Sequence, residues 1–298
     1  MPRHRPDRWD AVPRQDGRRF VVTGASGGLG LETARALAAA GAEVVLAVRN
    51  VEKGAAAAAA VSGPRSAPVE VRRLDVADLS SVREFADDVG AVDVLVNNAG
   101  VLAVPRALTV DGFETHLATN HLGHFVLTNL LLPRLTDRVV VVSSDSHRHA
   151  DLDLTDLAWE RRPYKPYAAY GASKLANLLF LAELQRRLTA AGSTLRATGA
   201  HPGSTATGIT ANTGSRVKTW VGSWGHPLFG MPPWQGALTT LYAATMDVPG
   251  NTFIGPGGFL EMRGWPTGVG RSQQATDPEL AKALWLRSEE LTGVSFPL

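Results

Sequence analysis

The chain has 298 residues, of which 44% are hydrophobic and 19% charged, with a formal net charge of +2 and no cysteine. This length suits one large α/β domain or two small ones, and the composition is that of an ordinary soluble globular protein. The lack of cysteine excludes disulfides, thiol nucleophiles and cysteine metal sites and is compatible with a cytoplasmic location, and the small net charge does not indicate a nucleic-acid partner.

Residues 1–17 carry three prolines among charged residues and are expected to form a flexible lead-in to one domain over residues 18–298. No apolar stretch follows the first basic residues, so a secretory signal is not expected. No apolar run approaches the roughly 20 residues of a membrane-spanning helix, so no integral membrane segment is expected either.

From residue 18 onward, short apolar runs alternate with stretches typical of helices. The expected strands are 20–22, 43–48, 69–74, 92–96, 139–142, 195–200 and 252–254. The expected helices are 28–40, 55–60, 79–89, 113–131 and 170–190. Almost continuously apolar strands are typical of a parallel sheet covered on both faces. The pattern therefore predicts an α/β fold, a doubly wound parallel sheet with helices on both faces and right-handed crossovers.

Residues 204–235 interrupt this alternation and are rich in Gly, Thr, Ser and Trp. Such a segment is too long for an ordinary connection, so we expect a lid on the substrate side. Its large apolar side chains are Trp220, Trp224, Phe229, Met231 and Trp234. They suit an apolar substrate wall, but packing of a loop onto the core or a partner surface explains them equally well.

A glycine-rich turn, residues 23–30 (Thr-Gly-Ala-Ser-Gly-Gly-Leu-Gly), lies between the first expected strand and the first expected helix. Glycines let the backbone approach a pyrophosphate closely, and the free N–H groups at a helix N-terminus favour an anion. The spacing is Gly-x-x-x-Gly-x-Gly rather than the common Gly-x-Gly-x-x-Gly. The residues expected to bind a dinucleotide here are Gly24, Ser26, Gly27, Gly28, Leu29 and Gly30.

The choice of cofactor is expected to depend on Arg49, followed by Asn50, at the end of the second strand. An acidic residue there would accept hydrogen bonds from a free ribose 2′-hydroxyl, whereas a guanidinium suits a 2′-phosphate. The sequence therefore favours NADP(H) over NAD(H). Asp75, followed by Val76 at the end of the third strand, is placed to meet the adenine; alternatively, it caps the helix that follows.

Tyr170 and Lys174 stand four residues apart on an expected helix, so their side chains share one face. A phenol with a pKa of about 10 is a poor acid or base at neutral pH, and a nearby ammonium stabilises the phenolate and lowers that pKa. The pair is therefore a candidate proton donor and acceptor. Tyr164 and Tyr167 precede the same lysine without this spacing.

These motifs occur in the order typical of the short-chain dehydrogenases/reductases, and residues 18–265 resemble that family. The further matching motifs are Asn97-Asn98-Ala99-Gly100, Asn120, Ser143-Ser144 and Pro202-Gly203. Within the family, residues 111–116 and 120–125 resemble the retinol dehydrogenase branch, which is close to the WW-domain oxidoreductase and protochlorophyllide reductase groups. The resemblance implies a single-domain Rossmann-type fold and hydride transfer at a carbonyl or alcohol carbon.

The resemblance also implies a role for each matching position. Tyr170 would be the catalytic acid/base, and Lys174 would lower its pKa and bind the nicotinamide ribose. Ser144, preferred to Ser143, would hydrogen-bond the substrate oxygen, and Asn120 would hold a water that continues the proton path. The remaining positions around the cofactor would be Asn98, Ala99, Gly100, Pro202, Gly203 and Thr207.

The implied enzyme is NADP(H)-dependent and acts on an apolar small molecule that is retinoid-like, steroid-like, a lipid aldehyde or a secondary metabolite. Two alternatives stay open: a non-catalytic NADP(H)-binding sensor or scaffold, and another reaction on the same scaffold, such as epimerisation, dehydration or double-bond reduction. An insertion at 145–169 resembles one in the retinol dehydrogenase branch and is expected to border the entrance. A homo-oligomer is compatible with the sequence.

Histidines are grouped at two places. His147 and His149 flank Arg148 after the serines, and without a wider ligand set we expect them to be exposed or at a pocket rim, and expect no metal site. The helix expected at 113–131 carries three more, which are expected to make structural hydrogen bonds rather than to transfer protons: His116, His121 and His124.

Overall fold

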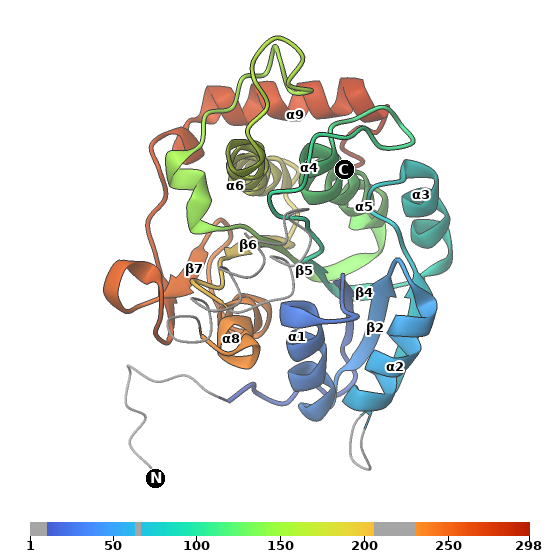
Figure 1. The fold of residues 1–298 in the computed structure, drawn as a ribbon. Coiled ribbons are helices and arrows are strands. Elements are labelled where there is room, and N and C mark those ends of the chain that lie inside the picture. Colours follow the sequence, from blue (N-terminus) through green and yellow to red (C-terminus); the bar gives the residue numbers. More distant parts are fainter. Residues whose placement is uncertain (1–10, 63–66, 206–230) are drawn as a thin grey trace.

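The computed structural model describes residues 11–62, 67–205 and 231–298 (Figure 1). Its centre is an eight-stranded sheet in the order β3-β2-β1-β4-β5-β6-β7-β8, parallel except that β8 pairs antiparallel with β7. The strands are β1 (Arg19–Thr23), β2 (Glu43–Val48), β3 (Val69–Arg73), β4 (Val92–Asn97), β5 (Leu135–Val142), β6 (Arg196–Ala200), β7 (Phe253–Pro256) and β8 (Pro266–Gly268).

Helices cover both faces of this sheet (Figure 1). On one face lie α1 (Gly28–Ala39), α2 (Val51–Val61) and α8 (Pro233–Thr245). On the other lie α3 (Leu79–Asp88), α5 (Gly123–Leu131), α6 (Pro166–Ala190) and α9 (Pro278–Thr292), with α4 (Thr115–Leu117) and the π-helix η1 (Ala118–Leu122) leading into α5. The single 3₁₀ turns are η2 (Leu132–Arg134), η3 (Asp145–His149), η5 (Phe259–Glu261) and η6 (Gln274–Thr276).

The sheet separates two apolar cores, and β1 contributes to both. Val21 packs with the residues of α3, α5 and α6, whereas Phe20 and Val22 pack with those of α1 and α8. All three side chains are fully buried. Burial of one such side chain contributes roughly 1.5–3 kcal/mol, so the central strands form a rigid base for the loops at their carboxyl ends.

The structure confirms the doubly wound α/β fold and all seven expected strands, with bounds that differ by a few residues. Strand β8 and helices α8 and α9 were not predicted. Helix α8 contains Gly236, Thr239 and Thr240, which have low helix propensity and hide its pattern. Helix α9 buries Ala281, Leu284 and Ser288 at spacings of three and four, a signal that could have revealed it.

The helix expected over 113–131 is not continuous. It begins at Thr115, where the buried carboxylate of Glu114 accepts a hydrogen bond from the amide of Leu117. The five-residue π turn η1 then shifts the hydrogen-bonding register, and the amide of Gly123 donates to the carbonyl of Ala118. Such π turns commonly occur at functional sites, and this one carries Asn120.

The expected flexible lead-in, residues 1–17, is described only from residue 11 onward. In that part Gln15 is buried, and its backbone amide donates a 2.8 Å hydrogen bond to the carbonyl of Ala40 after α1. Residues 11–17 are therefore attached to the domain rather than loose.

Most of the expected lid, including Thr207, Trp220, Trp224 and Phe229, lies outside the described residues. At its two ends, Thr205 and Met231 form a parallel bridge, and Met231 is buried. The last part of the expected lid, from Pro233, instead begins α8.

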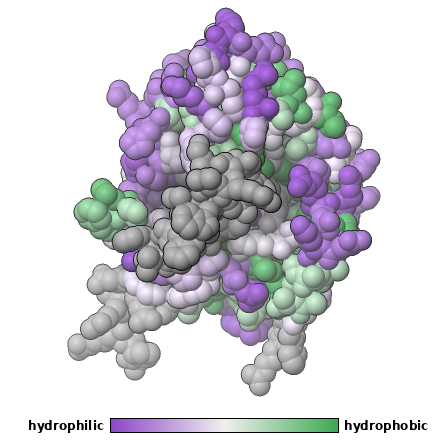
Figure 2. Space-filling view, in the orientation of Figure 1, coloured by the Kyte–Doolittle hydropathy of each residue, from purple (hydrophilic) through white to green (hydrophobic). Residues whose placement is uncertain are grey.

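Among the described residues, no helix combines the length and apolar character needed to cross a bilayer. One apolar projection does stand out from the surface at η5, at the left of Figure 2. Its side chains Phe259, Leu260 and Met262 are 83%, 68% and 41% exposed.

The strand order places the candidate site. The chain runs outward from β1 through β2 to β3, then returns to β4 on the other side of β1. The connections after β1 and β4 therefore leave the sheet in opposite directions and open a crevice at the carboxyl ends of these strands. In doubly wound folds this is the position where ligands bind.

Candidate active site

A cavity of about 430 Å³ lies in this crevice. It is lined by Gly24, Ser26, Gly27, Gly28, Leu29, Gly30, Ala47, Arg49, Asn50, Lys53, Leu74, Asp75, Val76, Asn98, Ala99, Gly100, Val101, Thr119, Val142, Ser143, Tyr170, Lys174 and Pro202. The structure thus brings together the glycine-rich turn, the end of the second strand and the Tyr170/Lys174 pair. Sequence reasoning missed Lys53 and Thr119 among others.

The glycine-rich turn has the geometry of an anion cradle. Gly24 and Gly28 have φ values of +68° and +56°, which other residues rarely adopt. A Cβ on Gly30 would lie only 2.6 Å from the side-chain nitrogen of Asn98. No side chain caps α1 at Gly27, so the first N–H groups of the helix stay available to an anion.

The hydroxyl of Thr23, the last residue of β1, fixes this turn to its neighbours. Its Oγ1 accepts hydrogen bonds of 2.9 Å from the amides of Asn98 and Ala99 and lies 2.9 Å from Nε2 of His124. The Nδ1 of His124 lies 3.2 Å from the carbonyl oxygen of Asn120, which can only accept. Nδ1 therefore carries the proton, and the Thr23 hydroxyl donates to Nε2.

The helix histidines behave as expected. Burial lowers the pKa of His121 to about 3 and that of His124 to about 4, so both are neutral near pH 7. His121 Nε2 lies 2.9 Å from the hydroxyl of Ser288, and His116 Nδ1 lies 2.9 Å from the carboxylate of Glu114. All three make structural hydrogen bonds.

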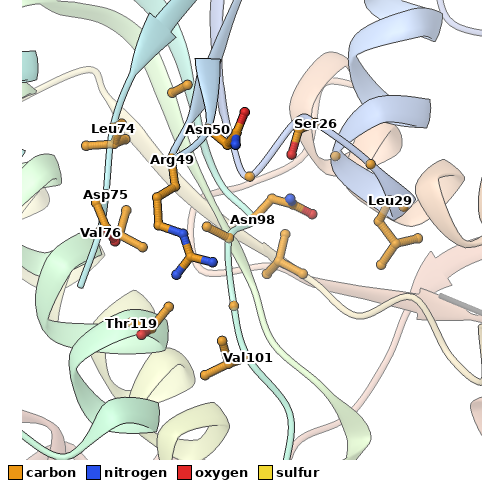
Figure 3. Close-up of a pocket in the computed structure, with 18 of the residues that line it drawn as sticks. Ser26, Leu29, Arg49, Asn50, Leu74, Asp75, Val76, Asn98, Val101 and Thr119 are labelled. Carbon is orange, nitrogen blue, oxygen red and sulfur yellow. The ribbon is translucent and has the colours of Figure 1, made fainter. Parts of the chain in front are cut away.

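The guanidinium of Arg49 reaches into the open space of the cavity (Figure 3). Asp75 and Val76 lie on one side of it and Asn98 on the other. Lys53 also lines the cavity. Within the described part of the chain, neither Arg49 nor Lys53 forms an ion pair with a carboxylate, so both charges are free to meet an anionic ligand.

Two polar residues near Arg49, namely Asn50 and Asp75, also have structural roles. Asn50 caps α2, because its Oδ1 accepts a 2.8 Å hydrogen bond from the amide of Lys53. The alternative role of Asp75 as a helix cap is wrong, since Asp78 caps α3 through the amides of Ser80 and Ser81. Asp75 instead bonds to the amide of Ala77 and faces the cavity.

Tyr170 and Lys174 lie on α6 on the side that faces the cavity. The Nζ of Lys174 is 5.7 Å from the centre of the Tyr170 ring and donates a 3.1 Å hydrogen bond to the carbonyl of Val142. The side-chain amide of Asn177 donates to the same carbonyl at 3.1 Å. The end of β5 thus holds the ammonium near the Tyr170 ring.

The pKa values of this pair are set first by burial. Burial raises the pKa of Tyr170 above its usual value, and a hydrogen bond with Ser144 offsets part of that rise. The net direction is opposite to the lowering that we predicted from Lys174. Burial also lowers the pKa of the Lys174 ammonium to about 8, which weakens its hold on a proton near neutral pH.

The two candidate serines have different surroundings. The buried Ser143 donates its hydroxyl to the carbonyl of Lys174 at 2.8 Å. Ser144 has its hydroxyl 3.2 Å from that of Ser146 and bonds to the phenol of Tyr170. Both hydroxyls are donated within the fold, that of Ser143 to Lys174 and that of Ser144 to Ser146, and of the two serines Ser143 lines the cavity. The preference for Ser144 therefore stays a prediction.

Asn120 is buried, and its side chain is occupied by the protein. Its Oδ1 accepts a 2.8 Å hydrogen bond from the amide of Val101, and its Nδ2 donates to the carbonyl of Val101 and to the hydroxyl of Ser173. A Cβ built on Gly100 would lie 3.0 Å from Oδ1 of Asn120 and 3.6 Å from Nζ of Lys174. The absence of a side chain on Gly100 therefore leaves space between the asparagine and the lysine.

The turn after β6 is shaped by the segment around η5. Pro202 lines the cavity, whereas Gly203 does not. Gly203 has a φ of +66°, and a Cβ there would lie 2.7 Å from the carbonyl oxygen of Met262. Gly203 thus allows the backbone after β6 to approach the backbone at Met262 closely. A second contact joins the same two segments, since His201 Nε2 lies 2.9 Å from the carboxylate of Glu261.

His147 is buried rather than exposed, which corrects the expectation. Its Nδ1 donates to the carbonyl of Ser144 at 2.8 Å, and its Nε2 accepts a bond from the amide of Ser272 at 3.2 Å. The histidine therefore joins η3 to the segment before α9. Among the described residues, no group of three or more His, Cys, Asp or Glu side chains is arranged to hold a metal ion.

Comparison with known proteins agrees with this geometry. Residues 18–218 match the family model described as short chain dehydrogenase. The chain belongs to the short-chain dehydrogenase family. It is 39% identical to human retinol dehydrogenase 13, with 94% of this chain and 86% of the relative covered, and 40% identical to mouse polyprenol dehydrogenase, with 95% and 86% covered.

A solved structure of this short-chain dehydrogenase fold, from Mycobacterium paratuberculosis, is 53% identical to the chain with a TM-score of 0.83, covering 96% of this chain and 97% of that one. The resemblance to the retinol dehydrogenase branch is confirmed by the relatives. The protein is accordingly an oxidoreductase of this family, and its named relatives act on alcohols.

Replacing Lys174 by methionine is expected to stabilise the fold at pH 7. The Lys174 pKa of about 8 lies below the ordinary 10.5, so holding the charged form in the folded state costs up to about 3 kcal/mol below pH 8. That cost disappears as the pH rises from 8 to 10.5. Urea unfolding at pH 7 and at pH 9.5 measures the difference.

The exposed Lys282→Met on α9 is the control, and its stability should match the wild type at both pH values. A Lys174→Met protein that is less stable than the wild type at pH 7 would contradict the argument.

Replacing Gly100 by alanine is expected to fill the space between Asn120 and Lys174. We expect kcat to fall roughly tenfold or more, because general acid–base steps commonly contribute 10²–10⁴. Turnover of retinaldehyde with NADPH measures the effect, and Gly268→Ala, where a Cβ meets nothing within 4 Å, is the control. Equal kcat values in the two variants would refute a role for this space.

Proposed function

We propose that the protein is an NADP(H)-dependent oxidoreductase that interconverts an apolar carbonyl compound and its alcohol. The observation that carries the proposal is one cavity lined by the glycine-rich anion cradle, by the two cations Arg49 and Lys53, and by Tyr170 and Lys174. Ser144 stands just outside this lining and bonds to the Tyr170 phenol. The cavity's polar groups fit a dinucleotide along its length.

The reaction divides between cofactor and protein. When bound, NADP(H) supplies or accepts the hydride. Tyr170 donates its phenolic proton to the carbonyl oxygen during reduction and takes it back from the hydroxyl during oxidation. Ser144 hydrogen-bonds the same substrate oxygen and the phenol, and Lys174 places positive charge beside the phenolate. Lys174 is buried, and the low dielectric around it strengthens its interaction with the phenolate.

The preference for NADP(H) is supported by Arg49 together with Lys53. Lys53 occupies the first turn of α2, where the positive end of the helix dipole makes a cation unfavourable. A phosphate between Arg49 and Lys53 would compensate both charges. The 2′-phosphate that distinguishes NADP(H) from NAD(H) is such a group.

The single variants Arg49→Ala and Lys53→Ala are each expected to weaken NADPH binding by roughly 10–100-fold. This factor corresponds to the free energy of one hydrogen bond to a charged group. NADH binding should change less than threefold. Fluorescence titration of both reduced cofactors measures the effect, with Arg263→Ala at the exposed η5 segment as the control. Equal losses for NADPH and NADH would argue against a 2′-phosphate site.

The substrate class is proposed from the relatives. Retinol and polyprenol dehydrogenases are named for long apolar alcohols, so we propose a retinoid-like, polyprenoid or lipid aldehyde and its alcohol. A panel of retinaldehyde, a polyprenal, straight-chain aldehydes and a keto-steroid, each with NADPH and NADH, tests the class and the cofactor together. Turnover of short polar aldehydes alone would refute it.

Tyr170→Phe is expected to lower kcat by at least about 100-fold, because the ring stays and only the transferable proton is lost. NADPH affinity should stay within threefold of the wild type. Tyr167→Phe, on the exposed side of the same helix, is the matched control. Substantial turnover by Tyr170→Phe would rule out the acid/base assignment, and cofactor binding without turnover in the wild type would favour a sensor.

A further inference from the structure

The Tyr170 ring contacts a buried polar cluster that the reaction does not use. The cluster consists of Glu114, His116 and Tyr164, defined here as the rim cluster. The ring centre of His116 lies 6.3 Å from that of Tyr170, with an interplanar angle of 67°. This edge-to-face distance is within the range of favourable aromatic contacts, so His116 forms a side wall for the phenol.

The centre of the rim cluster is the carboxylate of Glu114, which is 1% exposed. Its Oε1 accepts a 2.8 Å hydrogen bond from the Tyr164 hydroxyl and lies 2.9 Å from His116 Nδ1, and its Oε2 accepts from the amide of Leu117 at 2.8 Å. Burial raises the pKa of Glu114, but the bonds from His116 and from backbone amides outweigh it, and the net pKa is lowered. The carboxylate is therefore ionised and fully bonded.

These bonds fix the orientation of His116. Its Nε2 accepts a 3.3 Å hydrogen bond from the amide of Val104, so the proton of the neutral ring is on Nδ1, toward Glu114 and Tyr164. Both ring nitrogens are thus bonded, and the side chain is fully buried. The imidazole cannot rotate without breaking a buried hydrogen bond, which costs roughly 1–3 kcal/mol.

The rim cluster also joins two segments that are far apart in sequence. Tyr164 belongs to the 145–169 insertion, which forms the yellow-green loop at the top of Figure 1, and Val104 belongs to the segment after β4. The guanidinium of Arg106 donates two bonds, of 3.1 and 3.0 Å, to the carbonyl of Ala158. Hydrogen bonds therefore join the insertion to the 101–113 segment near Tyr170.

The inner side of the insertion is packed, whereas its outer side is hydrophilic (Figure 2, top). Trp159 is buried with its ring centre 5.7 Å from that of Tyr164, edge-on, and the guanidinium of Arg162 lies 3.8 Å above the Trp159 ring. These contacts hold the Tyr164 hydroxyl in place. The insertion thus reaches Tyr170 through the partly buried Tyr164 and the fully buried His116.

We propose that Tyr164 and Glu114 are positioning residues, which hold His116 against the Tyr170 ring and so fix the angle at which the phenol meets the substrate oxygen. The inference rests on the proposed acid/base role of Tyr170. It assigns the insertion an indirect part in proton transfer, through the position of the Tyr170 ring, in addition to bordering the entrance. A misplacement of about 1 Å at such a group can cost about 100-fold in rate.

Tyr164→Phe removes only the hydroxyl and tests the proposal. With retinaldehyde and NADPH, or the fastest aldehyde of the panel, we expect kcat to fall about tenfold, with NADPH affinity within twofold of the wild type. The pH profile of kcat should also shift. Burial and the hydrogen bond with Ser144 set the pKa of Tyr170, and both change when the Tyr170 ring moves. Tyr167→Phe, three residues further on and 61% exposed, is the matched control.

A Tyr164→Phe protein with the kcat and pH profile of Tyr167→Phe would overturn the proposal. A Tyr164→Phe protein in which NADPH affinity and melting temperature fall together with kcat would also overturn it, because that result indicates a purely structural role. If Tyr164→Phe does not fold, Arg106→Ala is the second variant, because it removes the two hydrogen bonds to the Ala158 carbonyl that hold the insertion. An unchanged kcat and pH profile in Arg106→Ala would then overturn the proposal. Wild-type activity of Tyr170→Phe would instead refute the proposed function itself.

Discussion

The hydroxyl of Thr23 is the contact on which the geometry of this site depends. It accepts bonds from the Asn98 and Ala99 amides and donates to His124, which in turn bonds to the Asn120 carbonyl. The end of β1, the turn after β4 and the π-helical kink before α5 are thereby held at one point. Because burial lowers the pKa of His124 to about 4, the chain of bonds keeps one proton arrangement across the neutral range.

This fixed frame allows the protein to hold groups that are unfavourable for its stability. A buried ammonium, two unpaired cations at the cavity end and an unfilled space at Gly100 all oppose close packing and charge neutrality. All of them line or border the cavity, where the proposed cofactor and substrate would compensate for them. The apolar cores on both faces of the sheet supply the stability that compensates for them.

The rim cluster links the 145–169 insertion to the side chain that packs against Tyr170. Glu114 caps a helix, accepts from Tyr164 and orients His116, so one carboxylate serves the fold and the site together. Retinol dehydrogenase relatives share most of the length of this chain.

The sequence alone determined the sheet, the glycine-rich turn and the register of Tyr170 and Lys174, because these depend on local spacing and on continuous apolar runs. It did not reveal α8, whose glycine and threonines become helical only by packing on α1 and the sheet. Only the tertiary structure decided the direction of the Tyr170 pKa, the burial of His147 and the bonding of His116 to Glu114 and Tyr164. Burial and hydrogen-bond partners depend on segments that meet only in the folded chain, such as His116 with Tyr164 and His147 with Ser272, and no local pattern encodes these contacts.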